Sequence, residues 1–383
     1  MKKICMVVTI PATVENFVLD NAKYLHNEKG YDVTIICDED DRLREVIPDY
    51  IHYIPIPMSR GVNLSGLKAI KQFKKVFRKE KFDLVQYATP NASFYASIAA
   101  KKVKVPIRVY GQWGMRYVGF SGLKRKLFKF LEKIVCRNST HIVAVSEMNM
   151  QFAIEEKLCP KEKIQLVGNG GTIGVDMQLY DMEKKVYWRN KIRENFKIDA
   201  KTFVFGFAGR VAIDKGCKEL FASFKELTLY REDVKLLVIG PLEDGSGIDE
   251  ELWNWAKNSD RVIFTGRVNN SDMREYYSAI DVLVHPTYRE GFGMVIQEAG
   301  ALSIPVITTK IPGASEVMVD GESCVLVESK NTEDLKLAML RFIDNNELVS
   351  SLGNSAYQRT KQLYDRRIML ENQKRAFEVF LGE

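Results

Sequence analysis

The sequence predicts an α/β protein with two doubly wound domains. Short runs rich in valine and isoleucine alternate with helical patterns along most of the chain, as they do when helices cover both faces of a parallel sheet. A glycine-rich stretch interrupts this alternation near the middle, and the alternation then restarts. A chain of 383 residues, 46% of them hydrophobic, is also long enough to bury two sizeable cores.

The first domain is predicted over residues 1–168. Its first apolar run follows two lysines and resembles a short export signal. We interpret it as a buried strand, because it is brief, rich in β-branched residues and followed by an amphipathic segment. The helical patterns of this domain lie near residues 15–28, 64–80 and 91–101. Its strand-like runs are 3–10, 31–37, 82–88, 107–111, 141–146 and 163–168.

A linker is predicted at residues 169–181, where glycines and polar residues follow each other without periodicity. The second domain then covers residues 182–365, and the helical pattern at 366–383 is expected to cross back and complete the first domain. Because open sheets bind ligands at the carboxyl ends of their strands, we expect a cleft between the domains. The strand-like runs of the second domain are 202–209, 234–240, 261–266, 281–286, 304–309 and 323–328.

Composition excludes several classes of protein. The six cysteines include no Cys-x-x-Cys pair and the four histidines no ligand-spaced cluster, which favours a reducing cytoplasm and no structural metal. No apolar stretch approaches the roughly 20 residues that a membrane span needs. Residues 1–165 carry 28 Lys+Arg and 17 Asp+Glu, and within residues 60–137 the count is 19 basic to 3 acidic. The first domain should therefore present a broad positive surface.

Two cations stand in the loop that follows the first strand of the second domain. The segment "GRVAIDKG", residues 209–216, places Arg210 and Lys215 between a strand end and a helix start. Cations beside the free N–H groups of a helix N-terminus favour a diphosphate. The alternative is that both side chains are ordinary solvated loop cations, and the loop alone leaves the two interpretations equal.

The segment "REGFGM", residues 289–294, follows a later strand and leads into an almost wholly apolar helix. Gly291 and Gly293 should let backbone N–H groups approach a ligand closely. In that helix Gln297 and Glu298 are the polar members. A buried carboxylate needs hydrogen-bond donors, and for Glu298 these are ribose hydroxyls, a backbone cap or an arginine.

The spacing of two glutamates fits a long ligand. Glu290 and Glu298 would lie about 12 Å apart if the intervening residues were all helical. That separation is too large for the two carboxyl groups to share a proton. It suits one carboxylate at each end of a ligand with a diphosphate between them.

These motifs, together with "VIFTGRV" and "ALSIPVITTKIPGASEVM", resemble the GT4 family of retaining glycosyltransferases. The resemblance implies a GT-B fold, in which two Rossmann-like domains face a central cleft, and a nucleotide-sugar donor, for which UDP-sugars are favoured. It implies catalytic roles for Glu290 and for the diphosphate-binding pair Arg210 and Lys215, and a ribose contact for Glu298. The remaining donor-binding positions that it implies are Gly209, Arg267, Val268, Gly291, Phe292, Gly293 and Met294.

The first domain departs from a common family pattern. Where many members have His-Gly after a strand, this chain has Tyr110 and Gly111, followed by Trp113. We expect these three residues near the acceptor, with the usual histidine role open. The stretch 56–70 and the predicted linker resemble the surface-polysaccharide branch of the family, which implies a saccharide acceptor, often lipid-linked.

A basic amphipathic helix is predicted over residues 121–138. Lysines and arginines stand beside its apolar positions, which are Leu123, Leu127, Phe130, Leu131 and Ile134. Such a helix binds an anionic membrane surface, so we expect a peripheral protein at the inner face of the plasma membrane. The alternative is an ordinary helix whose apolar face covers the sheet.

The leading hypothesis is a retaining glycosyltransferase that needs no metal and no other cofactor and has no nucleic acid partner. Cations and helix ends would stabilise the leaving diphosphate, since no Asp-x-Asp motif follows a strand of the second domain. Two alternatives are a nucleotide-sugar epimerase and a non-catalytic nucleotide-sugar-binding protein on the same scaffold.

Overall fold

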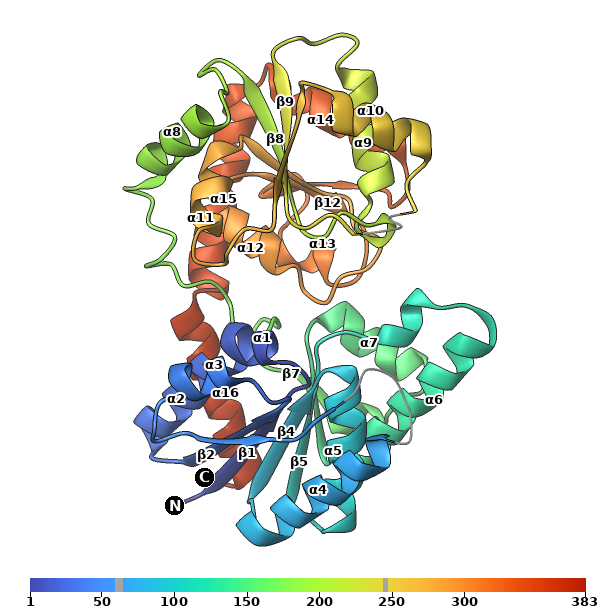
Figure 1. The fold of residues 1–383 in the computed structure, drawn as a ribbon, viewed down its shortest axis with the longest axis vertical. Helices are drawn as coiled ribbons and strands as arrows, with labels where there is room; N and C mark the ends of the chain where they lie inside the picture. Colours follow the sequence, from blue (N-terminus) through green and yellow to red (C-terminus); the bar gives the residue numbers. More distant parts are fainter. Residues whose placement is uncertain (59–64, 244–246) are drawn as a thin grey trace. The chain divides into compact units, whose positions relative to one another are not determined.

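A computed structural model describes residues 1–58, 65–243 and 247–383 (Figure 1). The chain forms two compact units. Unit 1 is Met1–Ile173 together with Arg367–Glu383, and unit 2 is Gly174–Arg366. The stretch 56–70, noted above for its family resemblance, includes residues 59–64, which lie outside the described residues.

Unit 1 contains a seven-stranded parallel sheet in the order β3-β2-β1-β4-β5-β6-β7. Every pairing between neighbouring strands is parallel. The order reverses between β1 and β4, as in a doubly wound sheet. The strands are β1 (Lys3–Val7), β2 (Asp32–Cys37), β3 (His52–Pro55), β4 (Leu84–Ala88), β5 (Ile107–Gln112), β6 (His141–Ala144) and β7 (Ile164–Leu166).

Helices cover both faces of this sheet (Figure 1). The helix expected near residues 15–28 is more irregular than its pattern indicates, because α1 and a five-residue π-helical turn, η1, precede α2. The helical segments are α1 (Pro11–Thr13), η1 (Val14–Val18), α2 (Leu19–Lys29), α3 (Asp41–Val46), α4 (Ser65–Glu80), α5 (Pro90–Lys102), η2 (Arg116–Gly119), α6 (Gly122–Asn138), α7 (Glu147–Glu155), η3 (Lys161–Lys163) and α16 (Arg366–Leu381).

Unit 2 contains a six-stranded parallel sheet in the order β10-β9-β8-β11-β12-β13, which reverses between β8 and β11. Its strands are β8 (Phe203–Ala208), β9 (Val234–Ile239), β10 (Val262–Gly266), β11 (Val282–His285), β12 (Val306–Thr309) and β13 (Cys324–Val327). Its helical segments are α8 (Lys185–Asn195), η4 (Ile213–Lys215), α9 (Cys217–Leu227), α10 (Glu250–Asn258), α11 (Met273–Ala279), α12 (Met294–Ala301), α13 (Ala314–Val317), α14 (Thr332–Ile343) and α15 (Asn346–Leu363).

The last helix, α16, packs on unit 1 although it follows unit 2 in the sequence. Phe377 and Phe380 are buried in the same core as the N-terminal strand. The hydroxyl of Tyr24 donates to Glu371 at 2.9 Å, and Lys29 pairs with Glu378 at 2.8 Å. Burial of these apolar side chains therefore holds the helix against unit 1, and the polar contacts stabilise the same packing.

The predicted linker is partly structured. The N–H of Val175 donates to the carbonyl of Tyr364, and the N–H of Arg366 donates back to Val175, each at 2.8 Å. The residues of the predicted linker from Gly174 onward therefore belong to unit 2, and residues 169–181 do not form a separate linker between the units. The physical reason is that extended backbone beside another strand-like segment satisfies its own hydrogen bonds there.

Candidate active site

Two loops of unit 2 meet where the strand order reverses. The first follows β8 and includes η4; the second follows β11 and leads to α12. Gly216 lies between η4 and α9 with φ of +72°, and a Cβ there would come within 1.9 Å of the carbonyl oxygen of Pro286. A glycine is therefore required for the first loop to approach the second so closely.

Glu290 lies at the centre of this meeting point. Its Oε2 accepts a hydrogen bond from Lys215 Nζ at 2.8 Å and lies 3.2 Å from His285 Nε2. Its Oε1 accepts the N–H of Gly291 at 3.0 Å. Burial alone would raise the pKa of this carboxyl, but the hydrogen bond from His285 and the charge of Lys215 together hold the pKa well below its usual range. Glu290 is consequently an anion.

His285 contributes a neutral ring to this cluster. Its side chain is fully buried at the end of β11, and burial lowers the pKa of the imidazole. With Nε2–H donated to Glu290, the other ring nitrogen carries a lone pair, and Nδ1 has no hydrogen-bond partner within the described chain. The structure thus places His285 in contact with Glu290.

Arg210 lies on the same loop as Lys215 but does not join the Glu290 cluster. Its guanidinium donates to Asp214 at 3.4 Å and to Glu243. Asp214 is shared with Arg289, which donates to it at 3.0 Å. Both cations that were predicted to hold a diphosphate are thus paired with carboxylates, and a dianionic ligand has to compete with these pairs.

The segment before α12 is not helical. The helix begins at Met294, with Gly293 at the N-cap in the left-handed region, φ +67°. The estimate of about 12 Å between the two glutamates, which assumed a continuous helix, therefore does not apply. The idea that the N–H of Gly291 is free for a ligand also needs correction, because this group already donates to Glu290.

Glu298 is held by two tyrosines. Its Oε2 accepts the hydroxyl of Tyr277 at 2.8 Å, and Tyr180 donates a second hydrogen bond to the carboxyl. Burial raises the pKa of Glu298 to about 7, and the two hydroxyls and the charge of Arg366 only partly offset this effect. Neither tyrosine was found from the sequence. The only signal was that a carboxylate in an apolar helix needs donors.

The other predicted donor-binding positions lie on neighbouring strand ends. Arg267 is exposed and Val268 is half-buried just after β10. Gly209 follows β8 directly, with φ of +146°. Phe292 is buried, and its ring packs edge-on against Tyr364 with centroids 5.5 Å apart, so that only its backbone is left to face a ligand.

The three residues expected near an acceptor separate in unit 1. Tyr110 is buried in the core on one face of the sheet, and its hydroxyl donates to Glu132 on α6 at 2.8 Å. Trp113 packs against the core on the other face, with its ring 5.8 Å from that of Phe17. Gly111 lies between them on β5, under the indole of Trp113.

A metal-binding cluster and a membrane-spanning helix are both absent from the described residues. No group of three or more histidine, cysteine, aspartate or glutamate side chains is arranged to hold a metal ion within the described ranges. Among the same residues, no helix combines the length and apolar character that crossing a membrane requires.

Comparison with known proteins gives a consistent family. The family model for glycosyltransferase family 4 matches residues 14–171, and that for glycosyl transferases group 1 matches residues 189–359. The capsular polysaccharide biosynthesis glycosyltransferase CapM of Staphylococcus aureus is 33% identical over 358 residues, which cover 93% of this chain and 92% of CapM. An Escherichia coli UDP-Gal:alpha-D-GlcNAc-diphosphoundecaprenol alpha-1,3-galactosyltransferase is 24% identical over 88% of this chain and 86% of its own length.

Solved structures match over the whole chain. A glycosyltransferase from Rickettsia africae has a TM-score of 0.81 at 20% identity and covers 100% of this chain and 99% of its own. Anabaena HepE, in complex with UDP and glucose, has a TM-score of 0.81 at 19% identity, with 99% and 100% covered. The fold is GT-B. With both family models and a close full-length relative in agreement, the chain belongs to the group 1, family 4 glycosyltransferases.

Proposed function

We propose that this glycosyltransferase moves a sugar from a UDP-sugar to a lipid-linked saccharide in surface polysaccharide synthesis, with retention of anomeric configuration. The observation that carries the proposal is the Glu290 cluster, which places an anion, a cation and a neutral imidazole together where two strand ends meet. The S. aureus and E. coli relatives support the class of pathway and acceptor, and HepE supports UDP as the nucleotide.

Unit 2 is the proposed donor site. Lys215 and Arg210 would bind the diphosphate, and the developing negative charge on the leaving group would draw them away from their present carboxylate partners. The backbone from Gly291 to Met294 would face the sugar and phosphate. The backbone at Arg267 and Val268 would contact the nucleobase, and Glu298 the ribose. Because two side-chain cations face the diphosphate, the proposed reaction uses no metal.

Glu290 would contact the donor sugar. Its carboxylate is ionised, and His285 and the N–H of Gly291 would keep it in place while Lys215 binds the diphosphate. This arrangement suits hydrogen bonding to sugar hydroxyls and stabilisation of positive charge at the anomeric carbon. His285 would act through Glu290 by orienting it. An epimerase or a non-catalytic binding protein on this scaffold would also bind the nucleotide sugar, so transfer itself has to be measured.

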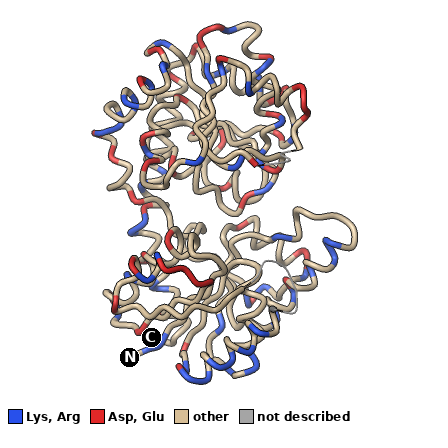
Figure 2. Tube along the Cα trace, viewed as in Figure 1, with Lys and Arg blue, Asp and Glu red and all other residues tan. Residues whose placement is uncertain are grey.

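Unit 1 is the proposed membrane-facing and acceptor-binding part. Of the five apolar positions predicted on α6, Leu123, Leu127 and Phe130 are 84%, 55% and 61% exposed, whereas Leu131 and Ile134 are half-buried. The spacing of the three exposed residues places them on one side of the helix. Lysines and arginines gather along α4 and α6 (Figure 2), and within the described chain an exposed apolar stripe bordered by these cations fits an anionic lipid surface.

The function is tested by release of UDP from UDP-glucose, UDP-galactose and their N-acetylated forms, with and without a diphosphate-lipid-linked sugar. We expect release that depends on the acceptor, with a product whose anomeric proton coupling matches that of the donor. EDTA should leave the rate unchanged. Conversion of donor without acceptor would instead favour an epimerase, and binding without either reaction a regulatory protein. Activity lost in EDTA and restored by Mg²⁺ would contradict the metal-free mechanism.

Changing Lys215 to Ala should lower the transfer rate by about 100-fold or more, because a cation facing the leaving diphosphate is removed. Arg210→Ala should have an effect in the same direction. Arg289→Ala is a matched control, since it removes a similarly exposed cation that also pairs with Asp214. Steady-state kinetics and thermal unfolding on all three variants separate catalysis from folding. Full activity in both Lys215→Ala and Arg210→Ala would remove them from the mechanism.

The affinity for UDP should depend on the ionisation of Glu298. With a pKa of about 7, this carboxyl is mostly ionised at pH 8 and mostly protonated at pH 6. Loss of the carboxylate as acceptor for ribose hydroxyls should therefore weaken UDP binding by about tenfold as pH falls over this range. Glu298→Gln should bind UDP weakly at pH 8 and lack this part of the pH dependence.

Calorimetry on both proteins provides the measurement, and their difference removes the contribution of the terminal phosphate, which titrates near pH 6. The folded-state pKa of Glu298 is raised, so its burial opposes folding at pH 8, and Glu298→Gln should not lower the melting temperature there. An identical pH profile in both proteins would assign Glu298 to a structural role.

Replacing Leu123, Leu127 and Phe130 together by Ser should reduce sedimentation with phosphatidylglycerol vesicles. Lys124→Ser with Lys126→Ser should also reduce sedimentation, but at low salt only, because salt screens the attraction between lysines and anionic lipid. These two lysines are chosen because Arg125 and Lys129 already pair with Glu156. Leu229→Ser with Tyr230→Ser is the control, because this pair is equally exposed in unit 2. Binding that is absent in the native protein, or unchanged in the triple variant, would assign α6 no role at a membrane.

A further inference from the structure

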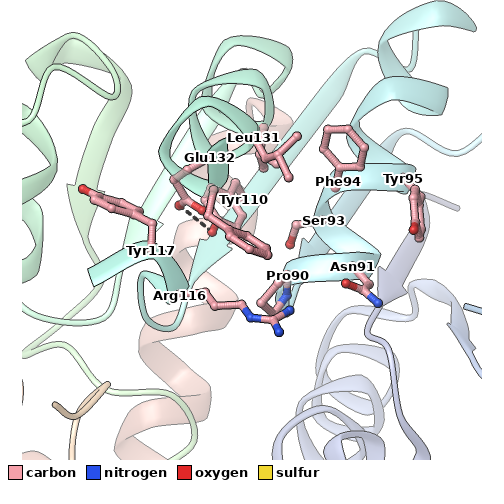
Figure 3. A pocket seen from close by; sticks show the side chains of 12 residues that line it. Pro90, Asn91, Ser93, Phe94, Tyr95, Tyr110, Arg116, Tyr117, Leu131 and Glu132 are labelled. Atoms are coloured by element: carbon pink, nitrogen blue, oxygen red, sulfur yellow. Dashed lines mark hydrogen bonds between the residues drawn. The ribbon is translucent and has the colours of Figure 1, made fainter. Parts of the chain in front are cut away.

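A pocket in unit 1 lies between α5, the end of β5, η2 and α6 (Figure 3). Of its lining residues, Tyr110 was expected near the acceptor from the sequence. The lining residues are Pro90, Asn91, Ser93, Phe94, Tyr95, Tyr110, Arg116, Tyr117, Phe128, Leu131, Glu132 and Val135.

The carboxyl group of Glu132 is the central polar group of this pocket. Its Oε1 accepts both the hydroxyl of Tyr110 at 2.8 Å and the amide of Gln112 at 3.0 Å. Its Oε2 receives no hydrogen bond from the described residues and is not sealed from solvent. Burial raises the pKa of Glu132 although Gln112 and Tyr110 both donate to it, and a further donor on Oε2 would stabilise the charged form.

A second polar group in the pocket also lacks a partner. The side chain of Ser93 is 1% exposed, and its hydroxyl makes no hydrogen bond within the described chain. In Figure 3 this hydroxyl points into the pocket from α5. Buried hydroxyls are nearly always hydrogen-bonded in folded proteins, and an unpaired one is costly. Ser93 and Glu132 together therefore present a donor and acceptors to an incoming ligand.

The remaining wall is apolar, and the mouth is cationic. Phe94, Phe128 and Leu131 line the pocket. Arg116 is exposed, stacks over Phe128 with its guanidinium carbon 5.0 Å from the ring centroid, and has no carboxylate within ion-pair distance among the described residues. An anion at the mouth would satisfy this cation, because arginine matches the oxygens of a phosphate in a bidentate geometry.

We propose that this pocket binds the sugar 1-phosphate portion of the acceptor, with a sugar hydroxyl or acetamido N–H on Glu132 and Ser93 and the phosphate on Arg116. The aromatic walls suit the apolar face of a pyranose ring or the methyl of an acetamido group. The proposal rests on the proposed function, since it assigns the acceptor of the same transfer reaction. It makes Glu132 and Ser93 specificity-determining residues.

The test compares Glu132→Gln and Ser93→Ala with the native protein. Saturation-transfer NMR would use glucose 1-phosphate, galactose 1-phosphate and N-acetylglucosamine 1-phosphate as probes. We expect at least one probe to bind in the millimolar range. Each variant should weaken that binding by about tenfold, as expected for a lost hydrogen bond to a buried partner. In transfer assays, the KM for the acceptor should rise by a similar factor while the KM for the donor stays unchanged.

Glu155→Gln is the matched control, because it removes the same charge from an exposed position on the neighbouring helix α7. Ser93→Ala breaks no existing hydrogen bond and should fold normally. It therefore still tests the proposal if Glu132→Gln fails to fold. Binding by none of the probes, or binding and acceptor KM unchanged in both variants, would overturn the proposal. If the native protein transfers sugar and both variants keep its probe binding and its KM for the acceptor, only this inference is refuted. If the native protein shows no transfer, the proposed function is refuted.

Discussion

The half-buried carboxylate of Glu290 is the constraint on which the proposed donor site depends. An ionised carboxyl group away from water is costly unless charges and donors surround it, and here Lys215, His285 and the N–H of Gly291 all do so. These contacts tie the loop after β8 to the loop after β11. Glycine at position 216 is what permits the backbones to come close enough. The site is therefore assembled, and its cations Arg210 and Lys215 are paired with carboxylates.

The two glutamates of the motif differ because their surroundings differ. Glu290 has a cation and an imidazole as partners, and its pKa is held low. Glu298 has two neutral hydroxyls, and burial raises its pKa. The same residue type thus gives a permanent anion at one position and a titratable acceptor at the other. This division matches a site that contacts a reacting sugar at one end and a ribose at the other.

Helix α6 combines two different surfaces through its periodicity. Leu123, Leu127 and Phe130 are exposed on its outer side. Phe128, Glu132 and Val135 face the pocket beside β5. A helix with 3.6 residues per turn separates these two sets of positions onto different sides. Under the proposals above, one element would both approach a lipid surface and contact the saccharide of a lipid-linked acceptor.

The sequence by itself indicated most of the elements and the order in which they alternate. Strand and helix periodicity are local properties, so the strands of both sheets other than β3 and the return of α16 to unit 1 were predictable. The edge strand β3 was missed, because it is only four residues long and its burial shows no alternation. The irregular start before α2 was not, because a π-helical turn leaves no periodic signal. The loops with Arg210, Lys215, Glu290 and Glu298 were found because their residue types and spacings resemble those of a family.

Only the tertiary structure decided which side chains meet. Tyr180 lies in the predicted linker and Tyr277 on a different helix, yet both donate to Glu298, and no pattern in the sequence relates them. Glu132 is the one acidic residue of the basic helix α6, and the register of β5 places Tyr110 and Gln112 against it. Such encounters depend on strand pairing and close packing between segments far apart in the chain, and a local pattern carries no information about them.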